Sequence, residues 1–152
     1  MATPTDHRRP SWHATWMDVA RVVANRSTCP RLAVGAVVVD SENVIVSTGY
    51  NGAPSHAPHC TEVGCEIDAT GSCRRTVHAE LNALLRAGPR ARGGTLYTTV
   101  EPCPTCAAAI VNAGIRTVVY SLPYRQIGGV RSGHDVLSSA GVVVIHAKED
   151  QS

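Results

Sequence analysis

Two short stretches of the sequence carry the residue types that a catalytic zinc site requires. His78 and Glu80 are separated by one alanine, and Cys103 and Cys106 are separated by two residues in a proline-bearing segment. One imidazole and two thiols make three protein ligands, the number typical of a catalytic zinc, whereas a structural zinc is usually closed by four. The pattern therefore predicts a zinc ion held by His78, Cys103 and Cys106, with one position left for water.

The carboxylate of Glu80 completes this pattern, and we expect it to transfer protons. Zinc lowers the pKa of a bound water from about 15.7 towards about 7, which supplies a nucleophile at neutral pH. Removing an amine from a cytosine-like ring also requires a general acid/base that protonates the ring nitrogen and the leaving amine. Glu80 lies two residues from His78, close enough to reach the water. It is therefore expected to be catalytic and not a ligand.

Each half of the pattern is common on its own. A lone C-x-x-C is more often a structural zinc knuckle or a redox pair, and His-Ala-Glu occurs widely, so single matches have little weight. Together and in this order they follow the H-x-E and P-C-x-x-C pattern of zinc-dependent nucleobase deaminases. Helical spacing also places Cys103 and Cys106 on one face of a turn, where the positive end of a helix would stabilise thiolates.

Helical and strand patterns alternate along the rest of the chain. We expect helices over 12–26, 78–87, 103–113 and 135–140, and strands over 32–39, 44–47, 95–100, 117–121 and 142–145. The first two strands flank a polar turn and predict a hairpin. The alternation predicts an α/β fold with a mixed sheet flanked by helices. Residues 1–10 are expected to form a disordered arm, which leaves 11–152 as a single domain.

Composition excludes several classes of protein. A chain of 152 residues with 43% hydrophobic content suits one globular domain. It contains no apolar run of about 18 residues and no signal-peptide core, which predicts a cytoplasmic protein without a membrane segment. A zinc-stabilised nucleic-acid-binding or editing module is the less favoured alternative. Such a module would need a basic stripe with interleaved aromatic residues, whereas the net charge is +2 and aromatic residues make up 4%.

A second group of cysteines lies outside the catalytic pattern: Cys29, Cys60, Cys65 and Cys73. Thiols in a cytoplasmic chain indicate metal binding more than disulfides, and four ligands close a structural zinc site. Three of them lie in residues 49–73, a segment without periodicity that a metal would keep ordered. His56 and His59 compete for a ligand position. The alternative is that one or more of these cysteines is a small buried apolar residue.

With these residues in view, the chain resembles the deoxycytidylate (dCMP) deaminases of the cytidine deaminase superfamily. The resemblance extends from about Trp12 to Ile145. It rests on the zinc motifs and on four further stretches: Arg26-Ser27-Thr28-Cys29-Pro30-Arg31, Val34-Gly35-Ala36, Gly49-Tyr50-Asn51-Gly52-Ala53-Pro54 and His78-Ala79-Glu80-Leu81-Asn82-Ala83. It implies a three-layer cytidine deaminase-like fold with a five-stranded mixed sheet, and hydrolysis of dCMP to dUMP and ammonia in pyrimidine nucleotide biosynthesis. The alternative is the same chemistry on a free nucleoside, a base or a cytosine-containing secondary metabolite.

The resemblance also implies residue roles. By the resemblance, Asn51 would contact the sugar or base. Apart from it, we expect Ala79 at the substrate site and name Arg26 and Tyr124 as candidate neighbours of the phosphate. Positions matching Cys29 and Cys60 ligate a second zinc in some microbial members.

The block from Gly49 to Gly52 lies near an effector site in regulated members of the family. We therefore expect a homo-oligomer, such as a hexamer, that is activated by dCTP and inhibited by dTTP with magnesium present. The competing interpretation is that Gly49, Asn51 and Gly52 only form a tight turn.

Five arginines around the first catalytic helix are further candidates for a phosphate clamp, because the forked donors of arginine match phosphate oxygens. Each of them alone is more typical of a solvated basic face. They are Arg74, Arg75, Arg86, Arg90 and Arg92.

Overall fold

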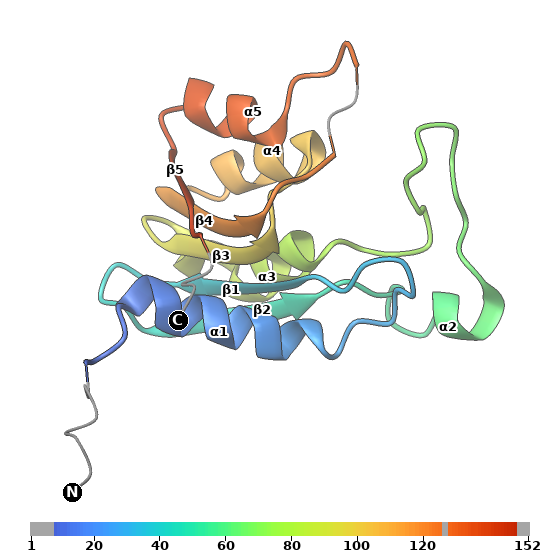
Figure 1. Ribbon diagram of the computed structural model, residues 1–152, viewed down its shortest axis with the longest axis horizontal. Helices are drawn as coiled ribbons and strands as arrows, with labels where there is room; N and C mark the ends of the chain where they lie inside the picture. The colour runs from blue at the N-terminus through green and yellow to red at the C-terminus, as the bar shows by residue number, and fades with distance from the viewer. Residues whose placement is uncertain (1–7, 126–127, 149–152) are drawn as a thin grey trace, which may run out of the picture.

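A five-stranded sheet organises the chain, with the strand order β2-β1-β3-β4-β5 (Figure 1). The computed structural model describes residues 8–125 and 128–148. Strand β1 (Gly35–Val39) is antiparallel to both β2 (Ile45–Tyr50) and β3 (Thr95–Val100), whereas β4 (Thr117–Leu122) and β5 (Val143–His146) extend the sheet in parallel with β3. The predicted mixed sheet is confirmed.

Strands β1 and β2 form the predicted hairpin around a polar turn. The side chain of Asp40 accepts hydrogen bonds from the backbone N–H groups of Glu42 and Val44, and Asn43 takes the positive φ that the turn requires. The register is irregular between Val38 and Val39. Strand β2 continues to Tyr50, three residues beyond the predicted end at Ser47, and this extension brings its end toward the first catalytic helix.

Helices cover both faces of the sheet and produce three layers (Figure 1). On one face, α1 (Trp12–Ala24) packs Met17 and Ala20 against a cluster that includes Val37 and Val39. On the other face lie α3 (Ala79–Ala87), α4 (Pro104–Asn112) and α5 (Gly133–Ser139), packed around a cluster that includes Val38. Successive valines of β1 thus face opposite layers, as strand geometry requires.

Two glycines allow the helices to approach the sheet closely. A Cβ atom on Gly35 would lie 2.0 Å from the carbonyl oxygen of Ala20 in α1, and one on Gly49 would lie 2.3 Å from that of Ala79 in α3. No other residue type fits at these contacts without moving a backbone. At Gly49, α3 therefore packs directly against the backbone of β2.

The segment between β2 and α3 projects away from the sheet (Figure 1). It contains the four-residue helix α2 (Cys60–Val63), and a short 3-10 helix η1 (Gly88–Ala91) follows α3; the sequence patterns predicted neither. No helix in the described part of the chain is long and apolar enough to cross a membrane. The first seven residues of the predicted arm lie outside the described residues, so the arm and the domain boundary at residue 11 stay predictions.

Candidate active site

The segment of His78 and the segment of Cys103 and Cys106 meet because the helices α3 and α4 begin at the same end of the sheet. His78 is the N-cap residue of α3, with φ −67° and ψ 150°. Cys103 is the N-cap residue of α4, which follows directly on the end of β3 and has Pro104 in its first turn. Proline suits that position because it has no N–H to leave unpaired. The partial positive charges of two helix N-termini therefore face the site.

The three predicted ligands converge to metal-binding distances. The Nδ1 atom of His78 lies 3.2 Å from the Sγ atom of Cys106 and 3.5 Å from that of Cys103. All three donor atoms lie within 4.8 Å of one another. Cys103 and Cys106 are buried, and His78 is partly buried. One nitrogen and two sulfur donors in this arrangement fit zinc, which favours imidazole and thiolate ligands.

The protonation of these groups favours a bound cation. The hydrogen bond from Cys106, together with the His78 ring, lowers the pKa of the Cys103 thiol to about 4 despite its burial. The Cys103 sulfur in turn raises the pKa of His78. The Cys106 thiol has a raised pKa because Cys103 accepts its proton and because it is buried. A site that already holds one thiolate and crowds a second thiol against it is suited to a divalent cation.

Glu80 lies in the first turn of α3, two residues from His78, and its side chain is buried. Burial raises the pKa of its carboxyl group from 4.5 to about 7. A carboxyl group with a pKa near neutrality can both accept and donate a proton at physiological pH. The structure therefore places a group suited to general acid/base chemistry beside the three metal donors.

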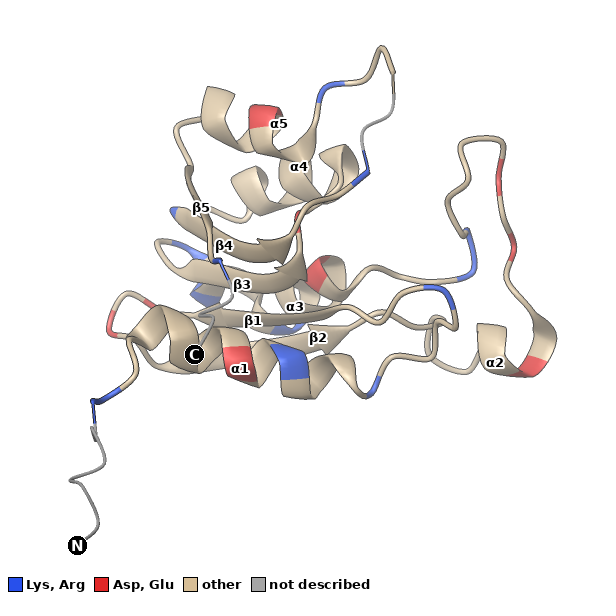
Figure 2. Ribbon diagram, in the orientation of Figure 1, with Lys and Arg blue, Asp and Glu red and all other residues tan. Residues whose placement is uncertain are grey.

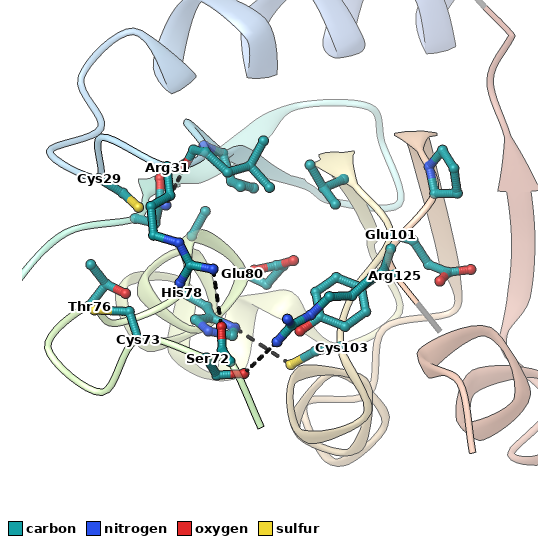
Figure 3. A pocket seen from close by; sticks show the side chains of 18 residues that line it. Cys29, Arg31, Ser72, Cys73, Thr76, His78, Glu80, Glu101, Cys103 and Arg125 are labelled. Carbon is teal, nitrogen blue, oxygen red and sulfur yellow. Dashed lines mark hydrogen bonds between the residues drawn. The ribbon is translucent and has the colours of Figure 1, made fainter. Parts of the chain in front are cut away.

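A cavity of about 370 Å³ opens over these residues (Figure 3). Its lining includes His78, Glu80 and Cys103, together with the predicted substrate residues Asn51, Ala79 and Tyr124. Its volume falls in the range of small-molecule sites.

Asn51 is buried, and its side chain is engaged with the neighbouring backbone. Its Oδ1 atom accepts a hydrogen bond from the N–H of Val34 at 2.9 Å, and its Nδ2 atom donates to the carbonyl of Leu32 at 2.8 Å. Both partners belong to the segment that leads into β1 and also line the cavity. Asn51 thus shapes the cavity wall, and one N–H of its amide is left for a ligand.

The block around Asn51 also anchors the catalytic helix. The carbonyl of Tyr50 accepts a hydrogen bond from Asn82 in α3 at 2.9 Å. Gly52 pairs with Val77, the residue before His78, through two backbone hydrogen bonds of 3.2 and 2.7 Å. Residues 49 and 50 belong to β2, so the block is a strand end and not a tight turn.

The arginines that line the cavity are not those singled out from the sequence. Arg26 stacks over the ring of Tyr50 at 5.8 Å and is not part of the cavity lining. The five arginines around α3 also lie outside the lining, and four of them bond elsewhere: Arg74 to Asp68, Arg75 to Gly64, Arg86 to Thr48 and Arg90 to Val46.

Arg31 and Arg125 instead lie at the mouth of the cavity. Figure 3 shows both guanidinium groups turned toward the segment that carries Ser72. Arg125 follows Tyr124 just beyond the end of β4, and ligands of open α/β sheets bind beyond the carboxyl ends of parallel strands. That rule could have identified Arg125 from the sequence, and Arg31 ends a stretch that carries the family resemblance, although the resemblance gave it no role.

Glu101 is a second buried carboxylate in the lining. It follows β3 directly, is 6% exposed, and its Oε2 atom has no hydrogen-bond partner among the described residues. In Figure 3 it lies on the side of the cavity away from Arg31. Sequence reasoning did not single it out.

The remaining cysteines form a second cluster of donors. The Sγ atoms of Cys60, Cys65 and Cys73 all lie within 4.8 Å of one another, and those of Cys60 and Cys73 are 3.6 Å apart. Cys29 lines the catalytic cavity and is not part of this cluster. The His59 ring, which contacts the hydroxyl of Thr28 at 2.9 Å, is not part of it either.

The electrostatics of this cluster also favour a cation. Burial and the two neighbouring thiols raise the pKa of Cys60 to about 12. Burial also opposes ionisation of Cys73, but backbone N–H groups, led by that of Glu66, lower its pKa to about 7. A metal ion would relieve the crowding of three sulfur atoms by binding them as thiolates.

Comparisons with known proteins agree with this geometry. The model of the cytidine and deoxycytidylate deaminase zinc-binding region matches residues 10–122. The ComE operon protein 2 of Bacillus subtilis is 37% identical over 146 residues, which cover 94% of this chain and 75% of that protein. The deoxycytidylate deaminase of Saccharomyces cerevisiae is 42% identical over 144 residues; the match covers 90% of this chain and 45% of the yeast protein.

A solved structure shares the fold over almost the whole chain. The dCMP deaminase of the cyanophage S-TIM5, in complex with dCMP and dUMP, superimposes with a TM-score of 0.75 at 33% sequence identity. The superposition covers 93% of this chain and 99% of the phage chain. The layered fold predicted from the sequence is therefore that of a structure that holds a pyrimidine nucleotide.

Proposed function

Because the chain belongs to the family of cytidine and deoxycytidylate deaminases, we propose that it hydrolyses dCMP to dUMP and ammonia. One observation carries the proposal: a buried carboxyl group with a pKa near 7 lies beside one imidazole and two thiols on the lining of a nucleotide-sized cavity. This arrangement suits the hydrolytic loss of an amine from a pyrimidine ring.

His78, Cys103 and Cys106 would hold the catalytic zinc. When bound, zinc acts as a Lewis acid that makes water nucleophilic at neutral pH. Glu80 would take one proton from the attacking water and deliver it to the ring nitrogen, and would then take the proton of the hydroxyl group added to the ring and deliver it to the departing amine, which leaves as ammonia. Its burial keeps the carboxyl group near its midpoint of titration at neutral pH, so that it can perform both transfers.

Cationic groups at the mouth of the cavity support a phosphorylated substrate, and we propose the monophosphate. With the pyrimidine over the metal donors, the phosphate of dCMP would reach Arg31 and Arg125, whose forked N–H donors match phosphate oxygens. Tyr124 and one N–H of Asn51 are left to contact the sugar. A free nucleoside or base would leave both arginines unused.

Steady-state assays with dCMP, deoxycytidine, CMP and cytosine test this assignment. We expect kcat/KM to be highest for dCMP, and at least about 10-fold higher than for deoxycytidine, since charge-assisted hydrogen bonds contribute about 1.5 to 3 kcal/mol. A kcat/KM for deoxycytidine or for cytosine equal to that for dCMP would refute the monophosphate preference and favour the alternative substrates.

A transfer-RNA:A34 deaminase is among the similar solved structures, with 26% identity and a TM-score of 0.61, which are lower than the 33% and 0.75 of the dCMP deaminase. In Figure 2 acidic and basic positions are interspersed along the described elements, and α1 carries both.

We also propose a structural zinc at Cys60, Cys65 and Cys73, which a fourth ligand would have to close because structural zinc sites usually have four. Three converging thiols in a segment with little core of its own support it. We expect two zinc ions per chain by elemental analysis, and Cys60→Ser should release one of them and lower the melting temperature. Cys29→Ser is the matched control, because Cys29 lies outside the cluster. One zinc per wild-type chain after metal loading would remove this proposal.

Regulation and assembly rest on the resemblance of Gly49 to Gly52 to the effector block of regulated members. We propose a cytoplasmic homo-oligomer, such as a hexamer, activated by dCTP and inhibited by dTTP with magnesium. Allosteric coupling typically changes affinity about 5- to 150-fold. Titrations of dCMP with and without each triphosphate test it. Superimposable hyperbolic curves would leave the block with its role in anchoring α3 alone.

A further inference from the structure

A short hairpin of residues 66–74 reaches the mouth of the catalytic cavity. Ile67 and Cys73 form an isolated β-bridge, and the N–H of Arg74 donates to the carbonyl of Glu66 at 2.7 Å. The tip residues Gly71 and Ser72, together with Cys73, line the cavity. The hairpin is therefore part of the substrate site, although it lies outside the sheet and its helices.

The tip of this hairpin binds both arginines of the cavity mouth. Arg31 donates from Nη2 to the carbonyl oxygen of Gly71 at 3.1 Å. Arg125 donates from Nη2 to the carbonyl oxygen of Thr70 at 3.0 Å and to the hydroxyl of Ser72 at 3.1 Å. The two arginines come from distant parts of the sequence, and Figure 3 shows them approaching Ser72 from two sides. The remaining N–H groups of each guanidinium are available to a ligand.

Arg31 and Arg125 are long, exposed side chains, and these contacts hold them in one conformation. A free arginine has about 2 kcal/mol of rotamer entropy, part of which is lost when it orders around a ligand. If the arginine is already ordered in the free protein, binding no longer carries that cost. The hairpin tip can therefore raise affinity for an anion without contacting the anion.

The hairpin depends on Asp68 for its shape. The Oδ1 atom of Asp68 accepts hydrogen bonds from the N–H of Thr70 at 2.9 Å, from its hydroxyl at 2.6 Å and from the N–H of Ser72 at 3.0 Å. Its Oδ2 atom lies 2.6 Å from Nε of Arg74. Through these four contacts to residues 70–74, Asp68 holds the tip of the hairpin in its conformation.

The base of the hairpin is held by the thiol cluster. Cys73 accepts a hydrogen bond from the N–H of Glu66 at 3.4 Å and joins Cys60 and Cys65 in the cluster. Most of the residues between Thr61 and Thr70 are exposed, so apolar packing contributes little to fixing this segment. Asp68 and the three cysteines are thus the groups that set where the tip lies.

We propose that the hairpin 66–74, fixed by Asp68 and by the cluster of Cys60, Cys65 and Cys73, is a positioning element that holds Arg31 and Arg125 for the phosphate of the substrate. This inference rests on the proposed function of the cavity. It gives the second cluster a role in substrate affinity in addition to its role in stability. Asp68 and the three cysteines act through the arginines and not on the reacting atoms.

The test compares a substrate that has a phosphate with one that lacks it. Asp68→Ala should lower kcat/KM for dCMP by about 10-fold through KM, because two arginine side chains must then be ordered on binding. Its kcat for dCMP, and its kcat/KM for deoxycytidine, should stay within about twofold of wild type. Asp68→Asn retains the Oδ1 acceptor and should restore most of the loss. Val63→Ala, an exposed change in α2 outside the hairpin, is the matched control.

Two further measurements make the test independent of turnover and of any one variant. The Kd of dUMP, measured by calorimetry, should rise by the same factor in Asp68→Ala. Cys65→Ser should show the same selective loss for dCMP while its catalytic zinc remains bound. Parallel losses for dCMP and deoxycytidine, or unchanged KM and Kd in both variants, would overturn the positioning role. Failure of the wild-type protein to deaminate dCMP would instead refute the proposed function.

Discussion

The contact between β2 and α3 at Gly49 sets the position of the catalytic helix, and Gly49→Ala tests that role. The added Cβ atom would lie 2.3 Å from the carbonyl oxygen of Ala79 and 2.5 Å from the backbone nitrogen of Ala83. Such contacts are essentially never shorter than 3.0 Å, so α3 and β2 must separate by at least about 0.7 Å. Glu80 follows Ala79 directly and must move with it.

The expected effects are a loss of stability and a larger loss of activity. Overpacking a well-packed contact costs about 1 to 3 kcal/mol. A shift of about 1 Å in a catalytic group can cost about 100-fold in rate. We therefore expect Gly49→Ala to unfold at lower denaturant concentration. For a separation of α3 and β2 close to the minimum of about 0.7 Å, kcat for dCMP should fall roughly 10- to 100-fold.

Denaturant titration and steady-state kinetics on zinc-loaded protein measure both effects. The matched control is Gly128→Ala, because a Cβ atom there would meet nothing within 4 Å. Stability within about 0.5 kcal/mol of wild type together with full activity would refute the reasoning, since surface changes away from special contacts typically stay within that range.

Three further substitutions probe the site. His78→Ala should lose the catalytic zinc by elemental analysis, and full zinc retention would contradict its assignment as a ligand. Arg125→Ala should lower kcat/KM for dCMP by about 10-fold or more, while Arg26→Ala, outside the cavity lining, should change it less than about threefold; equal effects would count against the proposed phosphate site. Glu101→Met replaces a buried carboxyl group, whose Oε2 atom has no hydrogen-bond partner among the described residues, by an apolar side chain of similar length, so it should raise the free energy of unfolding by about 1 to 3 kcal/mol; a decrease would show that the carboxyl group is stabilised where it lies.

Local patterns predicted the framework of this fold well. The strand over residues 95–100 has the predicted bounds, and the first helix begins at Trp12 as expected. Alternation of faces along β1 and helical spacing in α1 are properties of neighbouring residues, so a single sequence reveals them. The three donors around His78 were predictable for a similar reason: their chemistry restricts which residue types can stand at those positions.

The substrate end of the cavity was less predictable, because its residues meet through tertiary contacts. Arg31, Ser72 and Arg125 come from three separate segments, and no local spacing relates them. Arg26 was expected near the phosphate but stacks on Tyr50. Cys29 was expected in the second cluster, but its Sγ atom is not among the three that lie within 4.8 Å of one another, because cysteine counting carries no information about distance.

Ammonia release from dCMP, measured alongside zinc content in wild type and Glu80→Ala, tests the central claim most directly. The proposed function gives Glu80 the role of proton transfer and gives metal binding to three other side chains, as their burial and convergence suggest. The wild type should release one ammonia per dUMP formed. Glu80→Ala should retain its catalytic zinc while losing about 100- to 10,000-fold in turnover, the range of general acid/base contributions. Loss of that zinc from Glu80→Ala, or turnover close to wild type, would contradict the account.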